Sequence, residues 1–408
     1  PLADLRTRQG FRVKLIDIED IYSEFGQGLF SAQVLKDFIH FAATQWAAPA
    51  LKYVILVGDG TDDPRNSLGI GTKNTLPVHM MLGSAQDFAS DNWFVAFNPG
   101  DDLPNLSIGR IPGNTPNLIS AYVSKVMAYE EGSSRPQGQA AKDITFIADQ
   151  DQLGEEGFAP RVAQLSSQIS SINSALNPKV LSRVLVSDAD LKQQIISSFN
   201  SGSVIINYFG HGAENIWAGN SVFTNVDADA LSNNVYPVVI TMDCLNAAHF
   251  YANGYQTLAD RLLFNPNGGA IALWGSTSMT SSSSQAPYQT ALYQVIASTP
   301  LGIRLGDALR LAKVTGGWDP AKAEVLRSLT LLGDPMINII TPAPAPKAEP
   351  AAEEKDHGGF LACGTISSGS GGSGGGPNPS ALVEMGLLIM MVVASRKFLK
   401  VAPSFRLS

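Results

Sequence analysis

Two short stretches of the chain are almost entirely apolar and stop abruptly. They are "YVILVG" at residues 53–58 and "VVIT" at residues 238–241. Near-continuous apolar runs of this length are typical of strands that are buried on both faces of a parallel sheet. The same pattern predicts further strands, so that the full set is 11–17, 53–58, 144–148, 204–208, 238–242 and 269–274.

Stretches with helical periodicity lie between the predicted strands. They are residues 31–46, 116–131, 159–175 and 187–201. A chain that alternates buried strands with amphipathic helices forms an α/β fold, with helices on both faces of a mostly parallel sheet. With 408 residues, of which 44% are hydrophobic, the chain is long enough for a large core and, on length alone, for two domains.

The composition changes after "LLGDPMINII" at residues 331–340. Residues 341–380 are rich first in Pro and Ala and then in Gly and Ser, so we expect a disordered linker. The last segment, 381–408, begins with 14 mostly apolar residues and continues with the basic stretch "SRKFLK". A membrane span needs about 20 residues, but the basic residues that follow favour an apolar helix that anchors the chain in a membrane. The alternative is a C-terminal helix that is buried in the protein.

The charge and the ends of the chain narrow the class of partners. The net charge of −8 argues against nucleic acid, because phosphate binding needs clustered Lys and Arg. The chain starts at Pro1 and not at Met, so we interpret it as the downstream part of a longer precursor. Its two cysteines, Cys244 and Cys363, lie in such different contexts that we expect no disulfide between them.

Reactive side chains follow three of the predicted strands. Asp149 ends "ITFIAD", His211 ends "VIINYFGH" and Cys244 ends "VVITMDC". Ligands of open α/β sheets bind beyond the carboxyl ends of the strands. The 33 residues between His211 and Cys244 (244 − 211) fit one strand–crossover–strand unit. If the strands are neighbours, an acid, an imidazole and a thiol converge on one substrate bond.

These side chains suit acyl transfer. A thiolate is the nucleophile, and a nearby imidazole can lower the pKa of the thiol or protonate the leaving amine. Gly210 and Gly212 allow a close approach of the backbone to a ligand, and the N–H groups of Gly212 and Cys244 can form an oxyanion hole. A carboxylate such as Asp149 or Asp151 can orient the imidazole.

The same residues also have a structural interpretation. Cysteine is among the most buried residue types, and a cysteine at a strand end is usually inert packing. A histidine in a loop is more often a hydrogen-bonded structural residue than a catalyst. A metal site is favoured less, because His211, His249 and Cys244 lack a tight ligand spacing and zinc needs three or four ligands.

The motif "NYFGHGAENIW", followed by "MDCLNA", resembles the His and Cys motifs of the gingipain-type cysteine peptidases, relatives of caspases and legumains. Similar blocks occur in the expected order: "YVILVGDGTDDPRN", "SDNWFVAFNPGDDLPNLSIGRIPGNT" and "LTLLGDPMINI". The resemblance covers most of residues 1–340. It implies a caspase-like three-layer αβα fold with an N-terminal subdomain at 1–140, which begins after the family's first strand, and a catalytic subdomain at 141–340.

The resemblance also implies roles for the site residues. Cys244 would be the nucleophile, His211 the general acid and base, and Gly212 part of the oxyanion hole. The acidic partner of the histidine would be Asp149, with Asp151 and Glu155 as alternatives.

The sequence differs from that of lysine-specific family members in a loop that determines substrate specificity. Lysine-specific members carry an acid in the loop after the strand that matches "AIALWGS", whereas residues 276–286 here contain no carboxylate. Lysine specificity is therefore not expected, and arginine specificity would need another acid such as Glu155 or Glu156.

No cofactor is required, but relatives bind structural calcium through oxygen ligands. The candidate ligands form two acidic runs, and solvated turns are the alternative interpretation. The runs are Asp59, Asp62 and Asp63, and Asp87, Asp91, Asp101 and Asp102.

The tail is similar to bacterial C-terminal sorting signals, with Cys363 in "ACGTI" as the expected processing or lipid-attachment site. We therefore expect an exported, surface-anchored bacterial cysteine endopeptidase that acts on proteins or peptides and meets a sorting machinery. The alternatives are a catalytically inactive surface or adhesion module on the same fold, and a transpeptidase.

Overall fold

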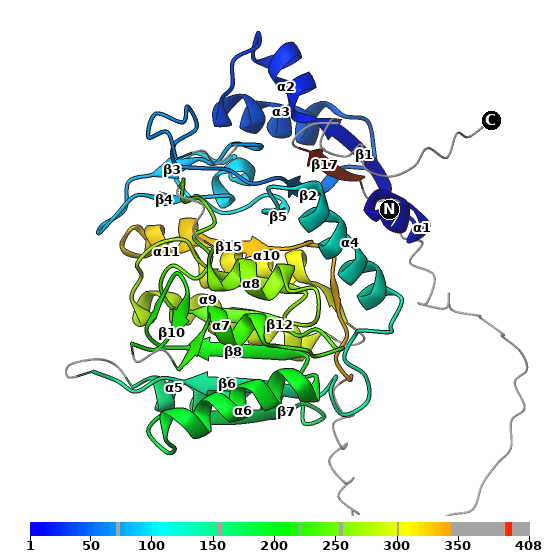
Figure 1. The fold of residues 1–408 in the computed structure, drawn as a ribbon. Helices are drawn as coiled ribbons and strands as arrows, with labels where there is room; N and C mark the ends of the chain where they lie inside the picture. The colour runs from blue at the N-terminus through cyan, green and yellow to red at the C-terminus, as the bar shows by residue number, and fades with distance from the viewer. Residues whose placement is uncertain are drawn as a thin grey trace, which may run out of the picture.

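A ten-stranded sheet forms the centre of the molecule (Figure 1). The computed structural model describes residues 1–70, 74–152, 157–219, 222–252, 256–299, 302–343 and 388–393. The strands, in their order across the sheet, are β1 (Arg12–Asp17), β17 (Leu388–Val393), β2 (Leu51–Val57), β5 (Ser107–Ile111), β15 (Leu329–Leu332), β13 (Ala272–Ser276), β12 (Val238–Met242), β8 (Ile205–Phe209), β6 (Asp143–Ala148) and β7 (Asn177–Ser182).

Neighbouring strands are parallel except for β13 and β15, which are antiparallel. The sheet therefore consists of two parallel halves that run in opposite directions. All six strands predicted from the sequence are present, and β12 has the predicted ends. The prediction missed β5, β7 and β15.

Helices surround the sheet. They are α1 (Leu2–Arg8), α2 (Ile18–Phe25), α3 (Ala32–Gln45), α4 (Pro116–Glu130), α5 (Phe158–Ile172), α6 (Asp188–Ser201), α7 (Asn225–Asp229), α8 (Leu258–Phe264), α9 (Ser282–Ser298), α10 (Leu305–Gly316) and α11 (Ala323–Ser328), with the 3-10 turns η1 (Asn92–Val95) and η2 (Pro320–Lys322). Local side chains fix several helix starts, since the Ser187 hydroxyl accepts the Asp190 N–H at α6, and Thr257 and Asp260 form a capping box at α8.

Short strands complete the architecture. β9 (Gly212–Ala213), β10 (Ile216–Trp217) and β11 (Phe223–Thr224) form an antiparallel sheet directly after His211. Two further pairs are β3 (Met80–Met81) with β4 (Phe88–Ala89), and β14 (Ile303–Arg304) with β16 (Asn338–Ile339).

The large sheet is the middle layer of an αβα sandwich. Successive residues of a strand point to opposite faces. In β8, the Asn207 side-chain oxygen accepts hydrogen bonds from Gln289 and Tyr293 of α9. The next residue, Tyr208, stacks on Trp217 of β10 with ring centroids 4.8 Å apart. Helix α9 and the β9–β11 sheet therefore cover opposite faces.

The sheet is continuous across residue 140, the predicted subdomain boundary. Strands from both sides of that residue meet where β5 pairs with β15. The main hydrophobic core also contains residues from both parts. A division into 1–140 and 141–340 remains a prediction.

The prediction of an apolar helix at 381–394 is wrong for the part that the structure describes. Residues 388–393 form β17, which lies between β1 and β2 and pairs in parallel with both (Figure 1). Ile389 and Met391 join the main core, whereas Met390 and Val392 join the core of α2 and α3. A short apolar run that is buried on all sides has the same pattern in a helix and in a strand. Here the run forms a strand because it pairs with the edges of β1 and β2.

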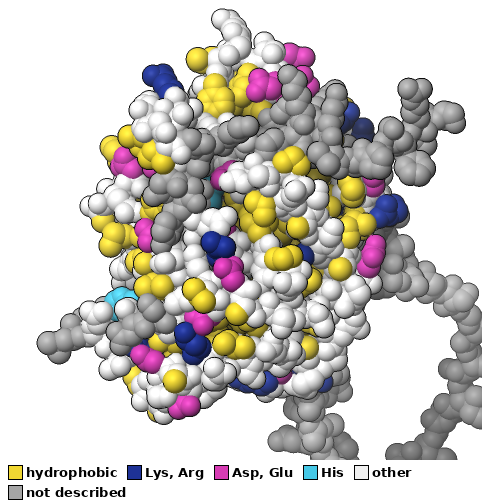
Figure 2. Space-filling view, in the orientation of Figure 1, with side chains coloured by type: hydrophobic (Ala, Val, Ile, Leu, Met, Phe, Trp, Pro, Cys, Tyr) yellow, Lys and Arg dark blue, Asp and Glu magenta, His cyan; other side chains and the backbone are white. Residues whose placement is uncertain are grey.

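Other predictions for the tail concern residues 344–387 and 394–408, including Cys363, which lie outside the described residues. Among the helices that the structure describes, none is both long and apolar enough to cross a membrane. On the face shown in Figure 2, Lys and Arg side chains are scattered, some of them beside acidic ones, and form no basic patch.

Candidate active site

His211 and Cys244 occupy equivalent positions on neighbouring strands. β8 ends at Phe209 and β12 ends at Met242, and these two residues are partners in the parallel ladder. His211 and Cys244 each lie two residues beyond their strand. On the other side of β8, Ala148 at the end of β6 pairs with Phe209, so Asp149 begins the adjacent loop. The three strand ends thus meet at one edge of the sheet, as the sequence predicted.

Asp149 is 1% exposed and contacts His211 through the main chain. Its carboxylate accepts hydrogen bonds from the His211 N–H at 3.1 Å, from the Tyr208 hydroxyl at 3.2 Å and from the Gln150 N–H at 2.7 Å. Arg183 adds an ion pair at 3.0 Å. The acid therefore holds the backbone of the histidine loop in place.

The two alternative acids have different positions. Asp151 accepts the Phe158 N–H at 2.6 Å and so stabilises the start of α5. Glu155, together with Glu156, lies outside the described residues.

The imidazole of His211 is half-buried beside α5. The Phe158 ring packs edge-on against it, with centroids 5.4 Å apart. The flanking glycines are required by close packing. A Cβ at Gly210 would lie 2.2 Å from the Asp149 Cβ, and a Cβ at Gly212 would lie 2.4 Å from an Asp243 carboxylate oxygen.

The Cys244 thiol is free and half-buried. Its sulfur accepts the Thr280 N–H at 3.4 Å and lies 3.5 Å from the Thr280 carbonyl oxygen. Burial raises the pKa of the thiol, and the nearby Asp243 acts in the same direction. The thiol is therefore protonated at neutral pH and needs a base to become a nucleophile.

The backbone after Cys244 is strained. Leu245 has a φ of +66°, in the left-handed region that few non-glycine residues adopt. Its N–H donates to the Ser278 carbonyl at 3.3 Å, and the Ala247 N–H donates to the Ser276 carbonyl at 3.1 Å. Strain held by such contacts is common where a side chain must be presented to a ligand.

Asp243 is a site residue that the sequence reasoning missed. It is 2% exposed, and neither carboxylate oxygen has a hydrogen-bond partner among the described residues. Burial raises the pKa of this carboxyl well above the usual range. The available signal was an acidic residue directly before Cys244, at the end of an apolar strand.

The Ser-rich loop at 276–286 borders the thiol, but its first residues are structural. Ser276, Thr277 and Ser278 are fully buried. The Ser278 hydroxyl donates to Glu324 of α11 at 2.6 Å, and a second Glu324 oxygen accepts the Ser84 N–H at 2.9 Å. The loop itself lacks an acid, as the sequence indicates, but α11 brings one to it, which the local sequence could not reveal.

Three of the acidic residues proposed as calcium ligands are held by other groups. Asp91 pairs with Arg110 at 2.7 Å, and Asp102 pairs with Arg327 at 2.5 Å. Asp63 accepts two main-chain N–H groups. Within the described ranges, no three His, Cys, Asp or Glu side chains are grouped so that they could hold a metal ion. Calcium binding stays a prediction without support from this arrangement.

The chain is similar to known proteins in both sequence and fold. The sequence matches Peptidase family C25 over residues 1–340. Gingipain R2 of Porphyromonas gingivalis is 21% identical over 253 residues in one strain and 22% over 252 in another. These matches span 61% of this chain but only 30% of the relatives' length.

Solved structures show the same fold. The Arg-specific cysteine proteinase gingipain R (RgpB) superposes with a TM-score of 0.64 at 18% identity, over 82% of this chain and 80% of that one. The complex of the Porphyromonas gingivalis RgpB pro- and mature domains gives 0.64 at 18% identity, over 81% and 79%. The fold is therefore the caspase-like αβα sandwich, and the chain belongs to the gingipain-type cysteine peptidases of family C25.

Proposed function

We propose that the protein is a cysteine endopeptidase in which Cys244 is the nucleophile and His211 is the general acid and base. One observation carries the proposal. The two side chains stand at equivalent positions, two residues beyond the paired ends of β8 and β12. Neighbouring strands lie about 4.8 Å apart, so both side chains can reach one scissile peptide bond.

The chemistry follows from the local environment. As the sulfur of Cys244 attacks the peptide carbonyl, its proton passes to His211, because the half-buried thiol is not ionised beforehand. The N–H groups of Gly212 and Cys244 stabilise the oxyanion. His211 then protonates the leaving amine, and the C–N bond breaks to give a thioester. Water, deprotonated by His211, then attacks the thioester. The C–S bond breaks and releases the acid product, and His211 returns the proton to the sulfur of Cys244.

Asp149 acts in this scheme as a positioning residue. Its hydrogen bond to the His211 N–H fixes the loop, and Arg183 holds the carboxylate in an ion pair at 3.0 Å. It never needs to exchange a proton with the substrate.

Labelling with an electrophilic peptide tests the proposal. Wild-type protein should form an adduct on Cys244, and Cys244→Ala should form none. His211→Ala should react at least about 100-fold more slowly, the typical contribution of a general acid–base residue. If wild type reacts no faster than Cys244→Ala, the protein is an inactive module on the peptidase fold. Peptide products ligated to an added amine in place of hydrolysis would identify a transpeptidase.

We also propose that the protein is exported and held at the bacterial surface by its tail before processing by a sorting machinery at Cys363. The support is compositional: a Gly/Ser tether, an apolar run and the basic residues Arg396, Lys397 and Lys400. Residues 388–393 would have to leave the sheet to enter a membrane. Mass spectrometry of the native protein should find a terminus near Cys363, and an intact Ser408 would contradict the proposal.

A further inference from the structure

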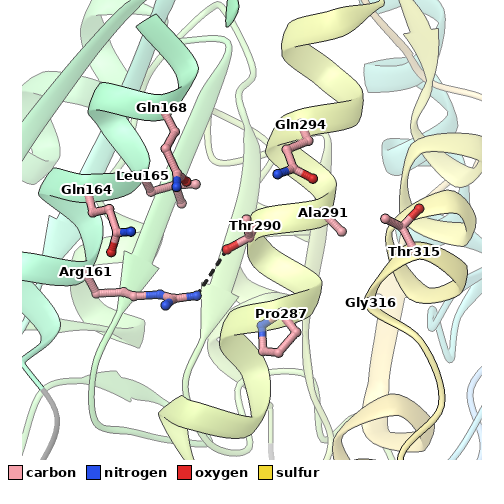
Figure 3. A pocket seen from close by; sticks show the side chains of 10 residues that line it. All are labelled: Arg161, Gln164, Leu165, Gln168, Pro287, Thr290, Ala291, Gln294, Thr315 and Gly316. Atoms are coloured by element: carbon pink, nitrogen blue, oxygen red, sulfur yellow. Dashed lines mark hydrogen bonds between the residues drawn. The ribbon is translucent and has the colours of Figure 1, made fainter. Parts of the chain in front are cut away.

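A polar cleft separates α5 from α9 on the face of the sheet away from β10 (Figure 3). Its volume is about 380 Å³, within the range of small-molecule and side-chain sites. Six polar residues line it together with four apolar or glycine residues, and none of the ten is acidic. The polar ones are Arg161, Gln164, Gln168, Thr290, Gln294 and Thr315. We call this space the α5–α9 cleft.

The two walls of the cleft begin at the two catalytic residues. α5 starts at Phe158, whose ring touches His211. Near the start of α9, the Gln285 amide donates to the main-chain oxygen of Asp243, the residue before Cys244, at 2.7 Å. Each helix rises about 5.4 Å per turn. The residues one turn further along the two helices therefore lie about one turn away from the loops that carry His211 and Cys244.

Arg161 and Thr290 are the residues at that depth. Arg161 lies three positions after Phe158, on the same side of α5, and its guanidinium donates to the Thr290 hydroxyl at 3.1 Å (Figure 3). This hydrogen bond crosses the cleft from one helix to the other. The guanidinium is half-buried, so a ligand charge that meets it is partly shielded from water.

Arg161 differs from Arg183 and Arg110 in its ion-pair partners. Arg183 pairs with Asp149 and Asp188, and Arg110 pairs with Asp91. Among the described residues, no carboxylate lies within ion-pair distance of Arg161. The neighbouring amides of Gln164 and Gln294 add neutral N–H donors, which carboxylate oxygens accept.

We propose that the α5–α9 cleft binds an acidic side chain of the substrate beside the cleaved bond, with Arg161 as the specificity-determining residue. The inference rests on the proposed peptidase function and names its substrate class. It also fits the lack of a carboxylate in the loop 276–286, because a cleft whose described lining contains an arginine and no acid selects against lysine and arginine side chains.

Peptide electrophiles that differ only in the residue before the reactive group test the proposal. Wild type should label at Cys244 at least 10-fold faster with Glu than with the isosteric Gln, and slowest with Lys. Arg161→Ala should remove the difference between Glu and Gln while it retains labelling with Gln. Arg161→Glu should reverse the order of Glu and Lys. Arg8→Ala, which removes an exposed arginine of α1, is the matched control and should behave as wild type.

Peptide binding to the Cys244→Ala protein tests the α5–α9 cleft separately from the peptidase function. Calorimetry should show tighter binding of the Glu peptide than of the Gln peptide, and Arg161→Ala in this background should make them equal. Equal rates and equal affinities for Glu and Gln in wild type overturn the role of the cleft but leave the peptidase function intact. Selective binding of the Glu peptide without any labelling of Cys244 overturns the peptidase function and retains an acidic-ligand site.

Discussion

The main-chain N–H of His211 donates a hydrogen bond to the buried Asp149 carboxylate at 3.1 Å, which ties the histidine loop to the end of β6. Arg183 neutralises this carboxylate and also pairs with Asp188, which is 44% exposed. Breaking a buried ion pair costs about 3–5 kcal/mol, whereas an exposed pair contributes about 1 kcal/mol or less.

Asp149→Ala should therefore lower the free energy of unfolding by about 3 kcal/mol and slow Cys244 labelling at least about 10-fold. Asp188→Ala should change both by much less. Urea unfolding and the labelling rate measure the two effects. Equal losses in the two variants would contradict the positioning role of Asp149.

Gly212 should tolerate no side chain while Asp243 is present. In Gly212→Ala the new Cβ would lie 2.4 Å from an Asp243 oxygen. We therefore expect the free energy of unfolding to fall by about 1–3 kcal/mol and the rate of Cys244 labelling to fall strongly. The double variant Gly212→Ala/Asp243→Gly should recover much of the stability, because the three nearest atoms to the new Cβ all belong to the Asp243 side chain. Gly219→Ala, where a Cβ meets nothing within 4 Å, is the control. A stable, reactive Gly212→Ala would disprove the close packing.

His249 should make the fold sensitive to acid. Burial lowers its pKa to about 4, against 6.5 in an unfolded chain, so between these values the unfolded state binds more protons than the folded state. Stability should therefore fall as pH drops from 6.5 to 4. Relative to His249→Gln, wild type should lose about 1 kcal/mol for each pH unit in this window.

Wild type must be compared with His249→Gln because Asp243 has the opposite effect on the pH dependence of stability. Its pKa is raised in the folded state, so its protonation favours folding as the pH falls. Urea unfolding at several pH values supplies the data. Parallel stability profiles for wild type and His249→Gln would show that the histidine takes up its proton without cost to the fold.

The tail should stabilise the folded domain through β17. Ile389, Met390 and Val392 are fully buried and Met391 is 3% exposed. Burial of one such side chain contributes about 1.5–3 kcal/mol. A chain that ends at residue 343 should unfold at a lower urea concentration and exchange the amide hydrogens of β1 and β2 faster. A chain that ends at residue 393 keeps β17 and is the control. Identical exchange in both would show that β17 is dispensable.

Local sequence predicted the parts of the site that depend on strand ends. The apolar runs of β8 and β12 are continuous and stop at loops, so their boundaries and the positions of His211 and Cys244 were readable. Strand β5, "SIGRI", was missed because Gly109 and the buried Arg110 interrupt its apolar pattern. Arg110 is buried because it pairs with Asp91, a contact that no local pattern encodes.

The contacts that could not be predicted are those made between distant segments. Glu324 reaches Ser278 from 46 residues away, and Arg161 meets Thr290 from 129 residues away. β17 was assigned as a helix because its six residues have no alternation that distinguishes the two structures. In each case tertiary packing decided what periodicity left open.

The position of β17 also sets the order in which the protein can be completed during synthesis. Arg12 in β1 pairs with Leu388, 376 residues later (388 − 12). Until the ribosome has made residues 388–393, β1 and β2 each lack this partner strand, while all residues of β6, β8 and β12 have already been synthesised. Open edges invite pairing with other chains. Newly made protein should therefore depend on chaperones at the β1–β2 edge, even after the loops that carry His211 and Cys244 have been synthesised.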